Sequence, residues 1–201
     1  MQLKAPILFI TSMAFCFMAH AQSNWETAMN KDDIIVYTRD EEHSDFKSFK
    51  AITEVKGTLN EVIKVLKDAD NYQAWYGFTK TSKVLKEEKN VQYNYVETIF
   101  PWPFSNRDMV YKMSINKLNS RELLISLEGI PDFIPKKNGI TRMQKAKGTL
   151  LLKSIIDKVE VTYQFHSEPG DTVPVWLANN SIAELPFKTL SGLKKILEKN
   201  K

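Results

Sequence analysis

The side chains best suited to chemistry are a carboxylate and a guanidinium in neighbouring predicted strands. Glu97 lies in residues 91–99, where alternate residues share one face, and Arg107 begins a similar run over residues 107–115. A charge buried in an apolar interior needs a partner, so we expect Glu97 and Arg107 to pair. Two interpretations stay open. The pair is either a polar handle for a ligand headgroup or a structural ion pair that fixes the strands.

Aromatic and methionine side chains recur on the same predicted faces as these two charges. The set that we expect to point inward consists of Tyr93, Tyr95, Met109, Tyr111, Met113, Tyr163 and Phe165. Such side chains either fill a solid core or line a cavity for an apolar molecule. The residues alone leave both interpretations open.

Motifs for catalysis are weak in this chain. Beyond residue 21 the histidines are His43 and His166, and neither has metal-ligand spacing to another histidine or to a cysteine. No nucleophile elbow, phosphate-binding loop or dinucleotide fingerprint occurs. We therefore expect no enzyme activity, no cofactor and no metal site. The alternative is acid–base chemistry by Glu97 together with Tyr95.

A long run of strands must position these residues. Alternation of apolar and polar side chains indicates sheet with one covered face and one solvent-facing face. Short turns between successive strands favour antiparallel pairing. The predicted strands cover residues 34–37, 47–55, 81–87, 91–100, 107–117, 121–128, 140–153 and 156–167.

Helices are expected at three places around this sheet. Residues 24–30 would form a short opening helix. Thr58 and Glu61 have the spacing of a capping box, which predicts that a helix begins there. A long helix should follow Pro174, with a kink at Pro186 because proline lacks a backbone N–H. The chain is therefore predicted to be α+β, with a curved antiparallel sheet wrapped around a C-terminal helix and an apolar space between them.

The first residues have the features of a secretory signal peptide. Lys4 provides a positive start, residues 5–18 are almost entirely apolar, and an A-x-A cleavage pattern ends at Ala21. The apolar run is shorter than the roughly 20 residues that a membrane span needs. We expect a signal peptide over residues 1–21, one domain over residues 22–201, and a periplasmic or secreted protein. The alternative is an uncleaved N-terminal anchor.

The charge of the chain is mildly positive and scattered. The formal net charge is +4, and the densest lysine positions are short pairs and the C-terminal tail. Nucleic-acid-binding proteins concentrate positive charge more strongly on one face. We therefore expect no nucleic-acid partner.

A long connection between two predicted strands combines apolar and basic residues. Residues 129–139 include Phe133 and Ile134, followed by two lysines. An apolar loop tip beside lysines is typical of a lid that makes transient contact with a membrane during ligand exchange. The alternative is a loop that packs back on its own domain.

Three segments of the chain have the pattern of a known protein family. Residues 101–108 read Pro-Trp-Pro-Phe-Ser-Asn-Arg-Asp and are similar to the P-W-P-x-S-x-R-D segment of bacterial members of the START lipid-binding family. Residues 33–39 followed by residues 46–50 resemble its opening strands, and residues 168–170 leading to residues 174–179 resemble the start of its last helix. The resemblance extends from about Trp25 to Leu197, and the order and spacing of the segments are its most specific feature.

The resemblance implies a helix-grip fold with a cavity for a lipid or other hydrophobic ligand. We expect an exported binding or transfer protein. The alternatives are a cyclase- or hydrolase-like enzyme that acts on a cavity-bound molecule and a non-catalytic interaction module with a filled core. The expected ligand-binding residues are Tyr93, Tyr95, Glu97, Arg107, Met109, Tyr111, Met113, Phe133, Tyr163 and Phe165.

One position departs from the family pattern. Sterol-binding members have a cavity arginine six residues after the first arginine of the motif, and this chain has Met113 there. The resemblance therefore does not imply a sterol held by the same ion pair, and Met113 would make that part of the cavity more apolar.

Overall fold

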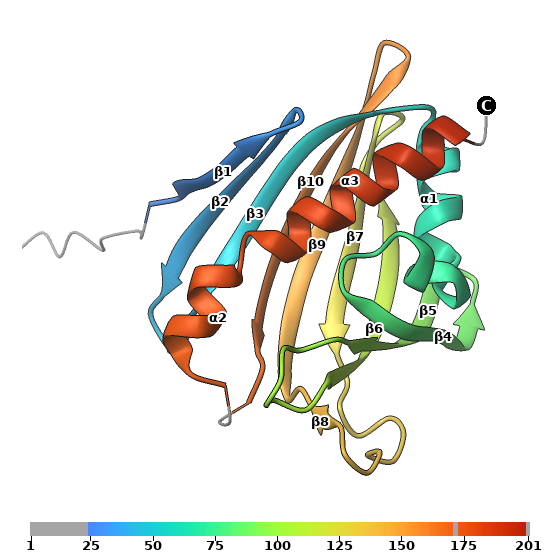
Figure 1. Ribbon diagram of the computed structural model, residues 1–201. Coiled ribbons are helices and arrows are strands. Elements are labelled where there is room, and N and C mark those ends of the chain that lie inside the picture. Colours follow the sequence, from blue (N-terminus) through green and yellow to red (C-terminus); the bar gives the residue numbers. More distant parts are fainter. Residues whose placement is uncertain (1–23, 171–172, 200–201) are drawn as a thin grey trace, which may run out of the picture.

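The computed structural model describes residues 24–170 and 173–199 (Figure 1). The expected signal peptide, residues 1–21, lies outside the described residues, and so does the choice between cleavage and an anchor. Within the described part of the chain, no helix is both long enough and apolar enough to cross a membrane.

One curved, ten-stranded sheet forms the body of the molecule. Nine strands follow the order β1-β2-β3-β10-β9-β7-β6-β5-β4 with antiparallel neighbours, and the short strand β8 pairs in parallel with β6. The strands are β1 (Glu26–Lys31), β2 (Ile34–Glu41), β3 (Ser44–Lys56), β4 (Thr79–Glu88), β5 (Val91–Thr98), β6 (Arg107–Lys117), β7 (Glu122–Gly129), β8 (Thr141–Arg142), β9 (Lys145–Ile155) and β10 (Lys158–Glu168).

Alternating side chains on the central strands create a covered concave face. On β10, Val161, Tyr163 and Phe165 are buried on this face. Tyr163 lies opposite Ala51 of β3, and Phe165 lies opposite Gly148 of β9. A Cβ atom at Gly148 would lie 2.3 Å from the Phe165 ring. The glycine therefore lets a large aromatic side chain pack close to the neighbouring strand.

Helix α1 (Leu59–Lys67) closes one end of the sheet, and the short 3-10 helix η1 (Ala69–Ala74) follows it. The predicted capping box is present at the start of α1. Thr58 Oγ1 accepts a hydrogen bond from Glu61 N at 3.3 Å, and Glu61 Oε2 accepts one from Thr58 N at 2.7 Å. Two N–H groups that α1 cannot pair internally are thereby satisfied.

The C-terminal segment forms two helices, α2 (Val175–Ser181) and α3 (Glu184–Lys199), which replace the predicted single kinked helix. The break lies before Pro186, which is the third residue of α3. In the first turn of a helix the N–H that proline lacks has no intrahelical partner, so proline is tolerated there. Helix α3 lies across the concave face and buries Leu190, Leu193 and Leu197.

The predicted opening helix over residues 24–30 is wrong. These residues contribute to strand β1, which pairs with β2 along the edge of the sheet. An isolated helix of seven residues has too few hydrogen bonds to compensate for its nucleation. A strand in the same place gains its backbone hydrogen bonds from the neighbouring strand.

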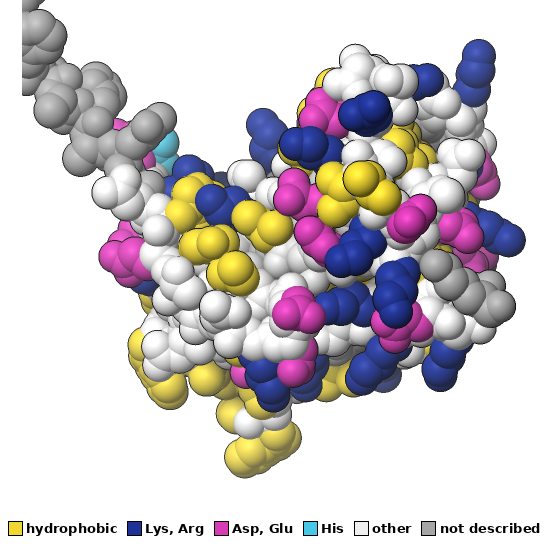
Figure 2. Space-filling view, turned by 90° about the horizontal axis from the view of Figure 1, so that it is seen from above, with side chains coloured by type: hydrophobic (Ala, Val, Ile, Leu, Met, Phe, Trp, Pro, Cys, Tyr) yellow, Lys and Arg dark blue, Asp and Glu magenta, His cyan; other side chains and the backbone are white. Residues whose placement is uncertain are grey.

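Charges of both signs are interspersed on the surface. The view along the sheet from above shows lysine and arginine side chains among acidic ones, with smaller hydrophobic areas between them (Figure 2). Several of these charges form exposed ion pairs, such as Lys158 with Glu54 at 2.7 Å. Such pairs contribute little to stability.

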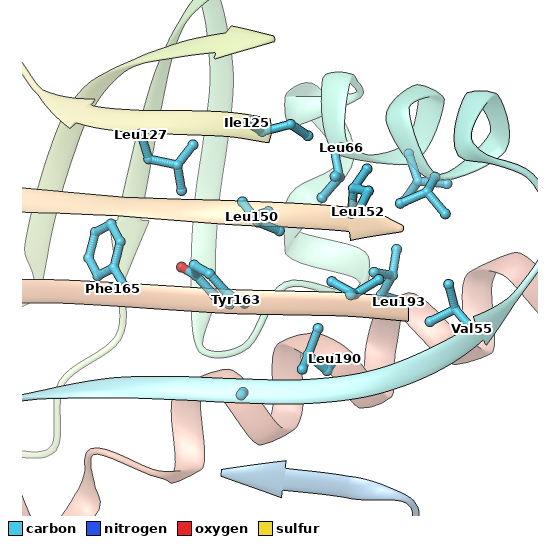
Figure 3. Close-up of a cluster of buried hydrophobic side chains, with 14 of the residues drawn as sticks. Val55, Leu66, Ile125, Leu127, Leu150, Leu152, Tyr163, Phe165, Leu190 and Leu193 are labelled. Carbon is cyan, nitrogen blue, oxygen red and sulfur yellow. The ribbon is translucent and has the colours of Figure 1, made fainter. Parts of the chain in front are cut away.

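The solid part of the core lies between α1, α3 and one half of the concave face (Figure 3). Val55 of β3, Leu152 of β9, Leu66 of α1 and Leu193 of α3 belong to this cluster. Each fully buried leucine contributes roughly 1.5–3 kcal/mol relative to an exposed one. The half of the sheet near α2 is not filled in the same way, and the cavity lies there.

Candidate functional site: an apolar cavity beneath the terminal helices

A cavity of about 500 Å³ lies between the concave face of the sheet, α2 and the start of α3. Cavities that hold drug-sized ligands have volumes of about 300–1,000 Å³. Its walls are mainly apolar and aromatic. They include Phe49, Phe78, Val96, Met109, Tyr111, Tyr163, Phe165, Leu177, Ile182 and Leu185.

The register of the sheet aims these side chains into the cavity. On β6, Met109 lies opposite Val96 of β5, and directly opposite residues of an antiparallel pair share one face. On β10, Tyr163 and Phe165 project from the same face and contact Phe49, whose ring meets Tyr163 edge-to-face at 5.0 Å. This part of the cavity wall is therefore built on strands, which hold the side chains more rigidly than loops would.

Three tyrosines form the inner end of the cavity. Tyr76, Tyr111 and Tyr163 line both this cavity and a small void of about 20 Å³ beyond it. The hydroxyls of Tyr76 and Tyr163 lie 2.6 Å apart and share a hydrogen bond. Burial raises the pKa of Tyr76 to about 12 and the pKa of Tyr163 well above its ordinary value. Both hydroxyls therefore stay protonated at neutral pH.

Acidic and basic side chains are confined to the rim of the cavity. Among the described residues that line it, Lys47 and Glu184 are the ones with acidic or basic side chains. The Lys47 ammonium pairs with Asp40, with Nζ and Oδ1 3.3 Å apart, and Glu184 is exposed in the first turn of α3. The inner wall therefore offers neutral hydroxyls and apolar surface.

Five of the predicted binding residues line the cavity or the small void beyond it. Met109, Tyr111, Tyr163 and Phe165 line the cavity, and Met113 borders the small void beyond the tyrosines. Their orientation agrees with the prediction. Their contact with a ligand stays a prediction.

Tyr93, Tyr95 and Glu97 point to the convex face of β5, so their predicted inward orientation is wrong. Glu97 lies opposite Asp108, whereas the cavity residue Met109 lies opposite Val96. Segment 129–139 covers this convex face. The Phe133 ring stacks on the Tyr93 ring with their centres 4.8 Å apart, and Lys137 Nζ lies 3.8 Å from the centre of the Tyr95 ring. Because both faces of β5 are covered, its pattern of apolar residues does not distinguish them.

The predicted ion pair between Glu97 and Arg107 is also wrong, because the two residues lie on opposite faces. Glu97 Oε1 accepts hydrogen bonds from Lys80 Nζ at 3.0 Å and Asn106 Nδ2 at 2.7 Å. Burial alone would raise the pKa of Glu97, but these two partners outweigh it and lower the pKa below its ordinary value.

Arg107 is fully buried but does not line the cavity. Its Nε donates to the Pro169 carbonyl at 3.0 Å, its Nη1 donates to the Ser105 carbonyl, and its guanidinium lies over the Phe100 ring. These contacts hold the segment between β5 and β6 against the segment that follows β10. They favour the structural interpretation of Arg107 over that of a headgroup ligand.

A buried ion pair between Asp108 and Arg142 went unrecognised in the sequence. Arg142 Nε and Nη2 donate to the two carboxylate oxygens of Asp108 at 2.7 and 3.1 Å. The same guanidinium donates to the carbonyls of Pro131 and Ile134. Asp108 follows Arg107 in the same strand, so the two side chains must point to opposite faces. A carboxylate on the convex face of a covered strand needs a basic partner there, and this requirement was the signal that could have revealed the pair.

The Asp108–Arg142 pair holds segment 129–139 on the convex face, so this segment is not a lid over the cavity. Phe133 accordingly lies against Tyr93 and away from the cavity wall. The structure matches the alternative of a loop that packs back on its own domain. Contact of this segment with a membrane stays a prediction.

Comparison with known proteins places this geometry in a family. Residues 16–201 match the family model of the START domain. The crystal structure of a STAR-related lipid transfer protein from Xanthomonas axonopodis is 37% identical, with a TM-score of 0.82, and the match covers 87% of this chain and 98% of that one. The curved sheet and terminal helix predicted from the sequence, a helix-grip fold, are thus confirmed.

Two further relatives match most of the chain. An uncharacterised protein of Pseudomonas aeruginosa is 30% identical over 177 residues, which cover 88% of each chain. The phosphatidylcholine transfer protein of Mus musculus is 26% identical over 164 residues, which cover 78% of this chain and 76% of that protein.

Proposed function

Because the chain belongs to the START domain family, we propose that it is an exported protein that binds a lipid-like molecule in its cavity and transfers it between membranes. The observation that carries this proposal is the apolar cavity of about 500 Å³ on the concave face. Burial of a ligand there would be driven by the removal of apolar surface from water, about 0.8 kcal/mol for each methylene group. A periplasmic or secreted location is part of the proposal and rests on the first 21 residues.

Ligand exchange requires the cavity to open, and α2 is the element best placed to move. None of its residues is fully buried, and the break before α3 separates it from the helix that fills the core. Asn179 tethers α2 to the start of β3 by accepting from Lys47 N and donating to the Asp45 carbonyl, both at 2.9 Å. Release of these two hydrogen bonds would let α2 swing away while α3 stays packed.

Two exposed tryptophans flank the rim of the cavity. Trp102 is 92% exposed and follows the lining residue Pro101, and Trp176 is 65% exposed and precedes the lining residue Leu177. Hydrophobic atoms project beyond the body of the molecule at one edge (Figure 2). Tryptophan favours the interface between lipid and water. We propose that this rim contacts the membrane.

Catalysis is not part of the proposal. The residues considered for acid–base chemistry, Tyr95 and Glu97, lie on the convex face and do not reach the cavity. Glu97 is ionised and engaged by Lys80 and Asn106. These contacts support a structural role for Glu97.

A lipid-transfer assay with a blocked cavity tests the proposal. Met109→Trp adds volume inside the cavity, and we expect transfer of a fluorescent lipid from donor to acceptor liposomes to fall at least tenfold. Lys112→Trp is the matched control, because Lys112 lies on the same strand but on the opposite, convex face. Transfer that persists in a folded Met109→Trp protein would contradict the proposal.

A further inference from the structure

Two tyrosine hydroxyls at the inner end of the cavity share a single hydrogen bond. Tyr76 and Tyr163 place their oxygens 2.6 Å apart. Each hydroxyl has one hydrogen to donate and two lone pairs that accept. Only one of the two hydrogens can lie between the oxygens, so the other must point elsewhere.

The second hydrogen has no hydrogen-bond acceptor among the described residues, although the Tyr111 hydroxyl belongs to the same end of the cavity. Within residues 24–170 and 173–199, neither hydroxyl forms another hydrogen bond. Tyr163 is 1% exposed, and its neighbours in the cavity wall are rings such as Phe49 and Phe165. A buried donor without an acceptor is costly, and a ligand oxygen in the cavity would remove that cost.

The same end of the cavity is unsuited to a charged group. The basic and acidic lining residues, Lys47 and Glu184, lie at the rim, and Lys47 already pairs with Asp40. An ionised headgroup beside the tyrosines would lose its hydration without gaining a counter-charge. Burial keeps the pKa of Tyr76 and Tyr163 high, so the hydroxyls remain neutral donors and supply no charge themselves.

We infer that the Tyr76–Tyr163 pair is the polar anchor of the cavity, and that it selects lipids with an uncharged oxygen at the end that enters first. A hydroxyl or a carbonyl oxygen would accept the spare hydrogen of the pair, and the apolar body would lie along the aromatic wall toward the rim. Ionised headgroups are excluded from the inner end. This inference rests on the proposed function, because it specifies the ligand class of the same cavity.

Probes of equal chain length separate this selectivity from simple hydrophobic binding. We would titrate the wild-type protein by native mass spectrometry with an alkane, a methyl ketone, a primary alcohol, an alkyl sulfate and an alkyltrimethylammonium ion. The ketone and the alcohol should bind about tenfold more tightly than the alkane, which is the upper range for one neutral hydrogen bond. The two charged probes should bind more weakly than the alcohol.

The double variant Tyr76→Phe/Tyr163→Phe tests the anchor itself. Either single variant leaves one hydroxyl of the pair that can still donate, so the preference for the ketone over the alkane should be lost only in the double variant. Tyr111→Phe removes the third hydroxyl that lines this end of the cavity and should keep the preference. The double variant should fold, because replacement of both partners of a hydrogen bond by similar apolar groups is nearly neutral. Tyr72→Phe is the matched control: its hydroxyl donates to the Leu66 carbonyl outside the large cavity, and the preference should persist.

Each result decides between defined outcomes. Equal binding of alkane and ketone by the wild type, tight binding of a charged probe, or a preference that survives in the double variant would overturn the inference and leave the proposed function intact. A wild-type protein that binds none of the five probes would overturn the proposed function and the inference together.

Discussion

At the residue scale, the buried Asp108–Arg142 pair is expected to have a large effect on stability. Both side chains are 1% exposed, and the guanidinium also donates to three carbonyls of segment 129–139. Removal of one partner leaves the other charge buried without compensation. The pair thus links the strand that carries Met109 to the segment that covers the convex face.

Arg142→Ala should lower the free energy of unfolding by about 3–5 kcal/mol, because Asp108 stays buried and unpaired. Urea unfolding followed by tryptophan fluorescence measures this change. Lys145→Ala removes an exposed ion pair with Glu168 and should leave the unfolding midpoint almost unchanged. Equal effects of the two substitutions would mean that the Asp108–Arg142 pair is not a major determinant of stability.

The prediction of which side chains face the concave side succeeded for strands with one covered face. It failed for strands whose two faces are both covered. On β10 the alternation of Val159, Val161, Tyr163 and Phe165 with polar residues identifies the concave face correctly. On β5 a loop covers the convex face, so Tyr93 and Tyr95 resemble core residues although they face away from the cavity. Tyr76 escaped notice because it follows η1 in an irregular turn, where no periodicity marks an inward side chain.

At the element scale, α3 crosses the backbone of Trp75, the residue that follows η1, at Gly192. A Cβ atom on Gly192 would lie 2.1 Å from the Trp75 carbonyl oxygen. The helix can approach this closely only because glycine has no side chain. The contact sets the depth at which α3 lies on the concave face, and it therefore helps to define the wall at the inner end of the cavity.

Gly192→Ala should destabilise the protein by about 1–3 kcal/mol, the usual cost of an overpacked contact. The sign of the change in unfolding free energy is informative, because alanine in the interior of an unconstrained helix stabilises it by about 1 kcal/mol relative to glycine. Ser191→Ala, at the neighbouring position of α3, should have little effect. Thermal unfolding of both variants measures the difference, and a more stable Gly192→Ala protein would contradict the close contact.

The elements themselves were largely predictable from local chemistry. The capping box at Thr58 and the turns between the strands are local signals, and the structure follows them. The strand β1 was missed because its hydrogen bonds come from β2 and not from its own sequence. The break between α2 and α3 was misplaced because a proline can either kink a helix or occupy its first turn, and only the packing of α3 decides which.

At the scale of the whole molecule, the fold has a solid end and a hollow end. The solid end holds the aliphatic cluster between α1 and α3, and the hollow end has the cavity and its exposed rim. Trp102 and Trp176 lie beside the rim, whereas Ile156 lies in the turn between β9 and β10 and is 91% exposed. The molecule therefore has exposed hydrophobic residues both at the proposed contact surface and away from it.

The double variant Trp102→Ala/Trp176→Ala should reduce liposome binding about tenfold or more and slow lipid transfer in parallel, because two interfacial side chains are lost. Ile156→Ala is the control, since it removes a similarly exposed apolar side chain in another part of the fold. Co-sedimentation with liposomes measures the binding. If Ile156→Ala has the larger effect, the rim is not the surface that contacts the membrane.

Native mass spectrometry of residues 22–201, purified from the native host, tests the central claim most directly. We expect the protein to carry one hydrophobic molecule, released on denaturation and identifiable after extraction, because the wall of the cavity of about 500 Å³ is mainly apolar and aromatic. The Met109→Trp protein prepared in the same way should lack it. A wild-type mass equal to that of the polypeptide alone, unchanged after incubation with lipids extracted from the host, would contradict the account and favour an interaction module.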